Sequence, residues 1–351
     1  MFGPVAARLP NVTHLIFEPD GAMLRLPINL LVTADTGLAA YEQRLVDPNA
    51  DPFDMRQIAW LGRTTRPSTA VSTLGFRNAR QAAPSKAANQ YFGLGENLPV
   101  SGRLPSLGTR GAAGGSIDGD CLWDVAQWAR PISADELVTA RNAMGGAAGT
   151  LLTGGAFTDS AVKSRADLND YRIIHFATHG LVTAPRAACP ARPALVTSFG
   201  GQDSDGLLTF QEIFDLKIDA DLVILSACDT AGAATVAATR EAGLSGGGNA
   251  LDGLVRSFIG AGGRSVIASH WPAPDDFDAT KRLIGGLFAA NQGTSVADAL
   301  WGTQVRLMDD KQTSHPYYWA GFAIIGDGSQ ALLHSGTVTA RNGEAAGRAA
   351  R

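Results

Sequence analysis

The sequence predicts an α/β fold with a mainly parallel central sheet and helices on both faces. Short apolar strands alternate with helical segments, and the strands expected at 171–178 (YRIIHFAT) and 221–228 (DLVILSAC) are apolar along most of their length. Such strands are buried on both faces, which is typical of parallel sheets covered by helices. The 351 residues are 45% hydrophobic, which is enough for a sizeable core.

The first part of the chain gives the weaker signals. Residues 1–11 form an N-terminal extension, and residues 12–17 predict a short strand that ends at the turn sequence EPDG. Residues 66–90 have a helix-like pattern. Residues 101–120 are rich in Gly and Ser without periodicity and predict a flexible insertion.

From residue 131 onward, strands and helices alternate clearly. Ser133 and Glu136 have the spacing of a capping box, which predicts a helix over 133–144. Loops are expected at 181–206 and 229–249, and residues 335–351 predict a disordered tail. The other elements expected, in order, are strand 149–154, helix 157–168, strand 171–178, helix 208–216, strand 221–228, helix 250–260, strand 264–269, helices 278–290 and 294–308, and strand 317–326.

Charge and cysteine content argue against several classes of protein. The net charge is −4 with no block of like charges, so neither direct nucleic-acid binding nor membrane binding is expected. The N-terminus lacks the pattern of a signal peptide, and no apolar run approaches the ~20 residues that span a bilayer. The three cysteines, Cys121, Cys189 and Cys228, have no CxxC spacing, which favours a reducing cytoplasm. Abundant Gly and Ala favour a bacterial source.

Two histidines, His175 and His179, stand four residues apart on the strand 171–178 and just after it. Such a pair can share a metal ion on a helix, but on a strand the two lie roughly 13 Å apart at ~3.3 Å per residue. That separation is too large for one zinc ion with bonds of ~2 Å, so neither a metal nor another cofactor is expected. His175 is predicted to be a buried, hydrogen-bonded core residue. His179 leaves the strand before Gly180 and is predicted to reach a substrate.

Cys228 has a comparable position, because it ends an apolar strand and precedes Asp229. Sites in parallel α/β sheets form at the carboxyl ends of strands, and neighbouring strands lie ~4.8 Å apart. Cys228 and His179 are therefore expected to lie close together, and an imidazole beside a thiol favours the nucleophilic thiolate. Cys121 and Cys189 are interpreted as ordinary free cysteines, the latter in a loop.

The segments HFATHG, LVILSACDTA, SFIGAGGRSVIASHWPAPDD and HPYYWAGFAIIG, in this order, resemble the CHAT domain, a family of caspase-like cysteine peptidases related to separase, gingipain and clostripain. The resemblance covers about residues 12–328 and implies a caspase-like sandwich, with 12–130 as an N-terminal pseudo-caspase-like part and 131–328 as the catalytic part. CHAT domains usually follow helical repeats such as TPRs. No period of about 34 residues is present here, so the repeats would lie elsewhere in a longer protein or on a partner.

The resemblance implies a cysteine endopeptidase with a dyad of His179 as base and Cys228 as nucleophile. The backbone N–H groups of Gly180 and Cys228 would form the oxyanion hole. No third, carboxylate member of the site is evident. The expected partners are a protein or peptide substrate and a regulatory protein of the TPR or another type.

The resemblance also implies an S1 pocket for a basic P1 side chain. Asp275, in the segment that begins at Trp271, is the candidate acidic residue, with Trp271 beside it and Asp229 as the alternative. A helix N-cap is the structural alternative for Asp275. His270 departs from the family pattern, in which a small or apolar residue is expected, and is interpreted as lining the pocket.

Two other interpretations stay open at this point. The chain could be a catalytically idle CHAT-fold module that acts as an interaction scaffold. An α/β-hydrolase is disfavoured, because it would need a G-x-C-x-G elbow and a histidine after the cysteine. Within the endopeptidase interpretation, loop 229–249 is expected to gate activity, and Arg240 in it is a candidate self-cleavage point.

Overall fold

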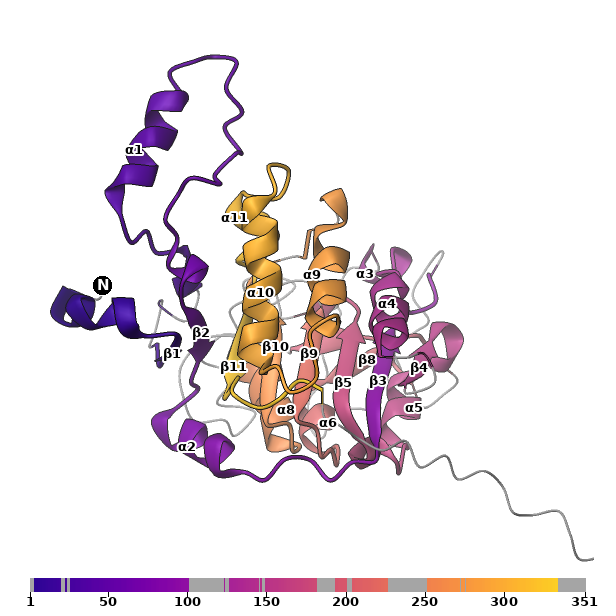
Figure 1. Ribbon diagram of the computed structural model, residues 1–351. Coiled ribbons are helices and arrows are strands. Elements are labelled where there is room, and N and C mark those ends of the chain that lie inside the picture. Colours follow the sequence, from indigo (N-terminus) through magenta and orange to yellow (C-terminus); the bar gives the residue numbers. More distant parts are fainter. Residues whose placement is uncertain are drawn as a thin grey trace, which may run out of the picture.

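The computed structural model describes residues 3–19, 23, 26–100, 123, 126–144, 146, 149–181, 193–200, 204–226, 251–271, 273–274 and 276–333 (Figure 1). The strands are β1 (His14–Phe17), β2 (Arg66–Thr69), β3 (Asn89–Gly95), β4 (Gly149–Thr153), β5 (Tyr171–Ala177), β6 (Gly180–Leu181), β7 (Ala194–Val196), β8 (Leu207–Thr209), β9 (Leu222–Ser226), β10 (Ser265–Ser269) and β11 (Phe322–Gly326). The α-helices are α1 (Asp35–Arg44), α2 (Thr73–Gln81), α3 (Ala126–Ala129), α4 (Asp135–Ala143), α5 (Asp159–Lys163), α6 (Phe210–Phe214), α8 (Arg256–Gly260), α9 (Ala279–Phe288), α10 (Val296–Asp309) and α11 (Pro316–Trp319).

Eight strands form the central sheet in the order β1-β2-β11-β10-β9-β5-β3-β4. Neighbouring strands are parallel except at β10 and β11, which are antiparallel. Strands β1, β2 and β11 therefore run in the opposite direction to the other five, and the two groups meet at this pair. A second, antiparallel sheet has the order β6-β7-β8. The prediction of a mainly parallel α/β fold is confirmed.

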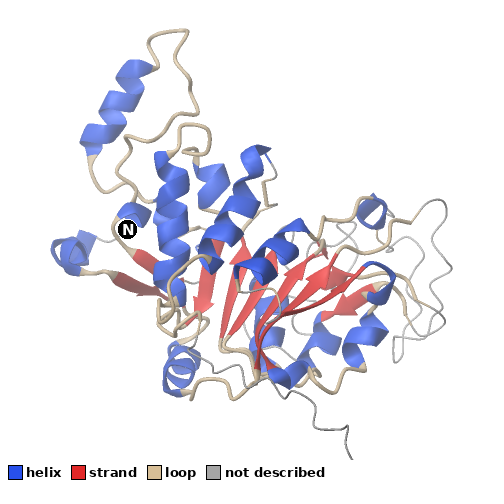
Figure 2. Ribbon diagram, turned by 45° about the vertical axis from the view of Figure 1, so that its right-hand side comes forward, coloured by secondary structure: helices blue, strands red, loops and turns tan. Residues whose placement is uncertain are grey.

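Helices cover both faces of the large sheet (Figure 2). Side chains alternate between the faces along each strand, so that Ile174 and Val223 pack on one side with α5, α6 and α8. Ile173 and Ile224 pack on the other side with α4, α9, α10 and α11. This double burial is the reason why the strands are apolar at nearly every position. Helix α1, by contrast, has no buried residue and projects away from the sheet (Figure 1).

Several predicted elements differ from the structure. Residues 66–90 contain strand β2, helix α2 and the start of β3, so the expectation of one helical pattern is wrong. Helix α2 is short and buries none of its residues. Strands β6 and β7 occupy part of the loop expected at 181–206, and the strand expected over 317–326 is divided into helix α11 and strand β11.

The predicted capping box at Ser133 and Glu136 is also wrong. Helix α4 has Ala134 at its N-cap without a side-chain hydrogen bond, and Glu136 is buried with its carboxylate in the core. A capping box does occur at α6, where Thr209 and Glu212 exchange hydrogen bonds with each other's backbone N–H. The predicted strands at 12–17, 149–154, 171–178, 221–228 and 264–269 are confirmed as β1, β4, β5, β9 and β10.

The expected two-part division at residue 130 stays a prediction. Strands from both sides of this boundary share the central sheet, because β3 lies between β5 and β4. The expected insertion at 101–120, loop 229–249 and tail 335–351 lie outside the described residues. Within the described part, no helix is both long and apolar enough to cross a membrane.

Candidate active site

The candidate site lies where β5 and β9 end side by side at the same edge of the central sheet. The two strands are parallel neighbours, and their last pairs in register are Phe176 with Leu225 and Ala177 with Ser226. Both strands are buried along almost their whole length. Sites in parallel sheets form at such carboxyl ends, as the sequence predicted for His179 and Cys228.

His179 stands where the chain passes from the large sheet to the small one. Strand β5 ends at Ala177, and β6 begins at Gly180. The Val196 N–H donates to the His179 carbonyl over 2.9 Å, and the Thr178 hydroxyl donates to the Val196 carbonyl over 2.6 Å. Strand β7 thus holds the backbone on both sides of the junction, and the His179 side chain is partly exposed at the edge of the sheet.

The imidazole of His179 is oriented by a backbone carbonyl. Its Nε2 lies 2.5 Å from the carbonyl oxygen of Arg130. A carbonyl can only accept, so Nε2 carries the proton and Nδ1 is the nitrogen that can take up another. Sequence reasoning missed this contact, because every residue type has a carbonyl group and no sequence pattern marks it.

A buried tryptophan fixes the position of that carbonyl. Trp128 is 1% exposed, two residues before Arg130, and packs with Leu181 and Val196 of the small sheet. Its indole N–H donates to the Gly206 carbonyl over 3.1 Å. The segment that orients His179 is therefore anchored to the same small sheet that holds the His179 backbone.

Gly180, the predicted oxyanion-hole residue, follows directly. It lies opposite Leu195 in the antiparallel pair of β6 and β7. The hydrogen bond from Val196 N–H to His179 O makes this a non-hydrogen-bonded pair. The β6–β7 ladder therefore does not use the Gly180 N–H, which points away from β7.

The end of β10, the next strand beyond β9, carries His270 and Trp271. The Trp271 indole N–H donates to the Tyr317 carbonyl over 3.0 Å, and its ring leaves no room for a Cβ at Gly321, which would lie 2.9 Å from Nε1. Burial lowers the pKa of His270 to about 4, so this imidazole is neutral at pH 7. Its Nδ1 is buried without a hydrogen-bond partner in the described part of the molecule.

The prediction for His175 is confirmed. Its side chain is 0% exposed in the middle of β5, and its Nδ1 lies 2.9 Å from the Tyr91 hydroxyl. The second ring nitrogen, Nε2, lies 3.2 Å from Oε1 of Glu136. His175 is therefore part of the core and belongs to a different environment from His179.

Several predicted residues lie outside the described part of the chain: Cys121, Cys189, Cys228, Asp229, Arg240 and Asp275. Their assigned roles stay predictions. For Asp275, one alternative can be examined, because α9 begins at Ala279 with Asp278 at its N-cap. The N-cap of α9 is thus not Asp275.

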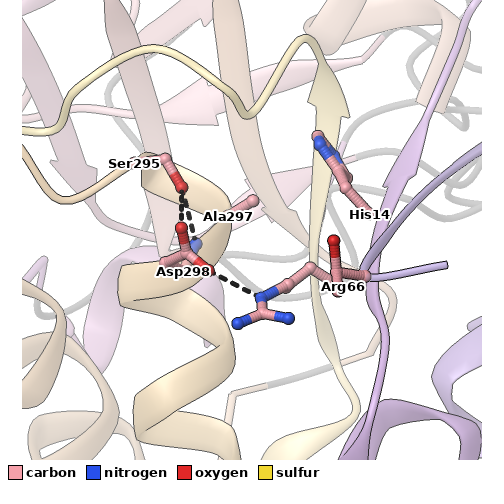
Figure 3. A pocket seen from close by; sticks show the side chains of 6 residues that line it. His14, Arg66, Ser295, Ala297 and Asp298 are labelled. Atoms are coloured by element: carbon pink, nitrogen blue, oxygen red, sulfur yellow. Dashed lines mark hydrogen bonds and ion pairs between the residues drawn. The ribbon is translucent and has the colours of Figure 1, made fainter. Parts of the chain in front are cut away.

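A pocket of about 280 Å³ lies elsewhere, beside β1 and α10 (Figure 3). Arg66 Nε donates to Asp298 over 2.6 Å, and Ser295 bonds the same carboxylate over 2.7 Å, so these polar groups satisfy one another. Strands β11 and β10 separate β2 from β9, so this pocket does not belong to the candidate site. Among the described residues, no group of three or more His, Cys, Asp or Glu could hold a metal ion.

Three solved structures align with this chain at low sequence identity. The complex of Porphyromonas gingivalis RgpB pro- and mature domains aligns with a TM-score of 0.48 at 9% identity, covering 95% of this chain and 70% of that one. The Arg-specific cysteine proteinase gingipain R aligns at 0.43 and 9%, covering 76% and 55%. The Saccharomyces cerevisiae separase–securin complex aligns at 0.39 and 11%, covering 75% and 14%.

Similarity to known sequences is more specific. Tetratricopeptide repeat protein 28 of Mus musculus is 30% identical over 121 residues, which are 34% of this chain and 4% of that protein. The Homo sapiens protein is 29% identical over 121 residues, with the same coverage. The chain thus matches only a small part of these much longer relatives. The model of the CHAT domain matches residues 1–327, nearly the whole length, and the chain therefore belongs to the CHAT domain family.

Proposed function

We propose that this chain is a cysteine endopeptidase whose dyad is His179 and Cys228. The observation that carries the proposal is the register of β5 and β9, which pairs Ala177 with Ser226. Continuing that register by two residues would set His179 opposite Cys228, on strands that lie ~4.8 Å apart. Membership in the CHAT family supports the same assignment.

The orientation of His179 suggests how the dyad would work. With Nε2 donating to Arg130, Nδ1 would accept the proton of the Cys228 thiol. The thiolate would attack the scissile carbonyl, the N–H groups of Gly180 and Cys228 would stabilise the oxyanion, and His179 would return its proton to the leaving amine. Water, activated by the same nitrogen, would then hydrolyse the acyl-enzyme and release the thiol.

The proposed specificity is for a basic P1 residue. Asp275 would bind the cation, with Asp229 as the alternative, through a charge-assisted contact. The indole N–H of Trp271 is engaged by the Tyr317 carbonyl, so Trp271 would offer a substrate its ring face. An aromatic face attracts an Arg or Lys side chain, which agrees with the same preference.

A protein partner is proposed as the regulator. The curated relatives are named for tetratricopeptide repeats, and this chain matches only 4% of their length. We propose that repeats of that kind, in the same protein or in another, control access to the site. Loop 229–249 would be the segment that gates activity. Arg240 in this loop would be a self-cleavage point, because it would supply the expected basic P1 residue.

The test is a panel of fluorogenic peptides that differ only at P1, with Cys228→Ala and His179→Ala as matched inactive variants. We expect hydrolysis after Arg or Lys by the wild-type chain and none by either variant. Equal turnover by Cys228→Ala would overturn the dyad, and cleavage after acidic residues would overturn the S1 assignment. The alternative is a catalytically idle interaction scaffold. It would be favoured if the folded protein, in the presence of the tetratricopeptide repeats, neither hydrolyses peptides nor reacts with a thiol-directed peptide probe.

A further inference from the structure

A cluster of four buried polar side chains lies beneath the candidate site. We define this buried polar cluster as Tyr91 of β3, Glu136 of α4, His175 of β5 and Ser226 of β9. The Tyr91 hydroxyl is 2.9 Å from His175 Nδ1, His175 Nε2 is 3.2 Å from Glu136 Oε1, and the Ser226 hydroxyl donates to Glu136 Oε2 over 3.0 Å. The four residues are between 0% and 6% exposed.

The direction of the hydrogen bonds follows from the carboxylate of Glu136, which can only accept. Burial, and after it the negative charge of Glu136, raises the pKa of Tyr91 well above its usual value, so its hydroxyl keeps the proton. Because Oε1 of Glu136 can only accept, a proton on Nε2 of His175 suits this contact and leaves Nδ1 to accept from the Tyr91 hydroxyl. The Nε2–Oε1 contact is not well aligned as a hydrogen bond, and the two atoms find no better partner among the described residues.

The backbone is built to admit this cluster. Gly93 is the register partner of His175, and a Cβ there would lie 3.0 Å from the Tyr91 hydroxyl and 2.7 Å from Leu151 Cδ2. The absence of that Cβ allows the Tyr91 ring to lie over the strand and reach His175. Further along, a Cβ at Gly95 would lie 2.1 Å from the backbone carbonyl oxygen of Ala177, so glycine is required at that position.

Stability gives no reason to keep such a cluster. Burying a carboxylate carries a desolvation cost, and replacing buried ionic groups by apolar residues is often neutral or stabilising. The position of the cluster suggests another reason. Glu136 bonds the last residue of β9, two residues before Cys228, and contacts His175, four residues before His179. The same segment of chain, six residues earlier, supplies the Arg130 carbonyl that orients His179.

We infer that Glu136 is a positioning residue that, through His175 and Ser226, holds the ends of β5 and β9 in the alignment the dyad needs. The inference rests on the proposed function and adds a third, buried member to it. Helix α4 thereby acts on the reacting groups without contacting the substrate. A small displacement of either strand end would lower the rate, since a misplacement of about 1 Å can cost on the order of a hundredfold.

The test measures alkylation of Cys228 by iodoacetamide across a pH series, together with kcat and KM. Cys121→Ser and Cys189→Ser are introduced first, so that Cys228 is the one remaining thiol in the sequence. The test variants are Glu136→Gln, which is nearly isosteric, and Ser226→Ala. The matched control is Leu137→Ala, the adjacent α4 residue, which is equally buried but has no polar link to either strand end.

We expect Glu136→Gln and Ser226→Ala to lower kcat and the alkylation rate by roughly tenfold to a hundredfold and to shift the midpoint of the pH profile, with KM unchanged. Leu137→Ala should lower the thermal midpoint and leave the other readings unchanged. Wild-type profiles in both test variants would overturn the inference. If His179→Ala changes the profile and Glu136→Gln does not, the inference alone is wrong. If His179→Ala has no effect either, the proposed dyad is wrong as well.

Discussion

His175, in the interior of β5, has no exposed surface, whereas His179, four residues further along the chain, is partly exposed at the edge of the sheet. His175 contacts side chains at both ring nitrogens, Tyr91 at Nδ1 and Glu136 at Nε2. His179 bonds a backbone carbonyl through Nε2. Strand β5 and the residues that follow it thus place the same residue type in two surroundings. The core surrounds His175, and the segments beyond the large sheet surround His179.

The difference indicates that the interior of the sheet suits a structural histidine, whereas its edge suits a candidate catalytic one. A side chain of β5, between β3 and β9, is fixed by packing from every side. The position of a side chain two residues beyond the last register pair depends on the adjoining segments, among them β7 and the segment that carries the Arg130 carbonyl. The removal of His179 should therefore leave the fold stable, whereas the removal of His175 should destabilise it.

Removing His179 should abolish activity and spare the fold. We expect His179→Ala to lower kcat/KM by about 10³-fold or more, as loss of a general base does in comparable sites. Its free energy of unfolding should change by no more than about 1 kcal/mol, because the side chain is not part of the core. Peptide hydrolysis and urea denaturation on the same preparation measure both. A large loss of stability would contradict the separation of roles.

Removing His175 should cost stability first, because its side chain is part of the core. His175→Leu leaves the Tyr91 hydroxyl and the Glu136 carboxylate buried without their partner, which should cost about 3–5 kcal/mol in the free energy of unfolding. The double variant with Glu136→Leu removes the stranded carboxylate, so it should be less destabilised than the sum of the two single variants. Urea denaturation of the three variants tests this. Additive losses would mean that the two side chains are not coupled.

His270, at the end of β10, extends the comparison to a buried strand end. Its pKa is lowered to about 4 in the folded protein, below the usual 6.5, by burial. As the pH falls from 6.5, the unfolded chain gains a proton at this position and the folded chain does not. Stability is therefore lost as the pH falls through this window, by up to about 3 kcal/mol near its lower end.

His270→Gln removes this contribution and should flatten the pH dependence of stability between about pH 6.5 and 4. Urea denaturation at several pH values, wild type minus variant, isolates it from the contributions of the other histidines. Parallel curves for the two proteins would show that His270 is more accessible to protons than its burial implies.

The smallest effect is expected at Thr178, between the two regions. Thr178→Val removes the hydroxyl that donates to the buried Val196 carbonyl and should cost about 1 kcal/mol of stability. Thr313→Val is a matched control, because its buried hydroxyl donates to the Leu307 carbonyl, away from the candidate site. Both should lose similar stability, but only Thr178→Val should lower kcat. Equal kcat values would mean that this bond does not help to hold His179.

The sequence predicted the elements that are buried on two faces. Strands β5, β9 and β10 were identifiable because nearly every position meets a helix or another strand, which leaves a continuous apolar run. Strand β7 has three residues and helix α2 has no buried residue. Neither element therefore contains a long apolar run that could identify it in the sequence. Glu136 misled the prediction because a buried acceptor and a capping residue have the same spacing in the sequence.

The candidate site was predictable in part for a related reason. A histidine that precedes a glycine at a strand end can be recognised from the sequence alone, and so can a histidine within an apolar strand. The Arg130 carbonyl and the Glu136–Ser226 bond are not, because they join segments 49 and 90 residues apart through groups that any sequence could contain. Only the folded chain brings these segments together.

The reversal of direction between β10 and β11 has a practical consequence for handling the protein. Strand β11 begins beside Ser269, at the edge where β5 and β9 end, and it finishes beside Ser265 at the opposite edge. The segment after it stays there, since the Gly293 N–H donates to the carbonyl of Leu333, the last described residue. A dye or surface linker attached at Leu333 would therefore lie across the full length of the strands from His179. Protein immobilised through this position would keep the candidate site facing the solution.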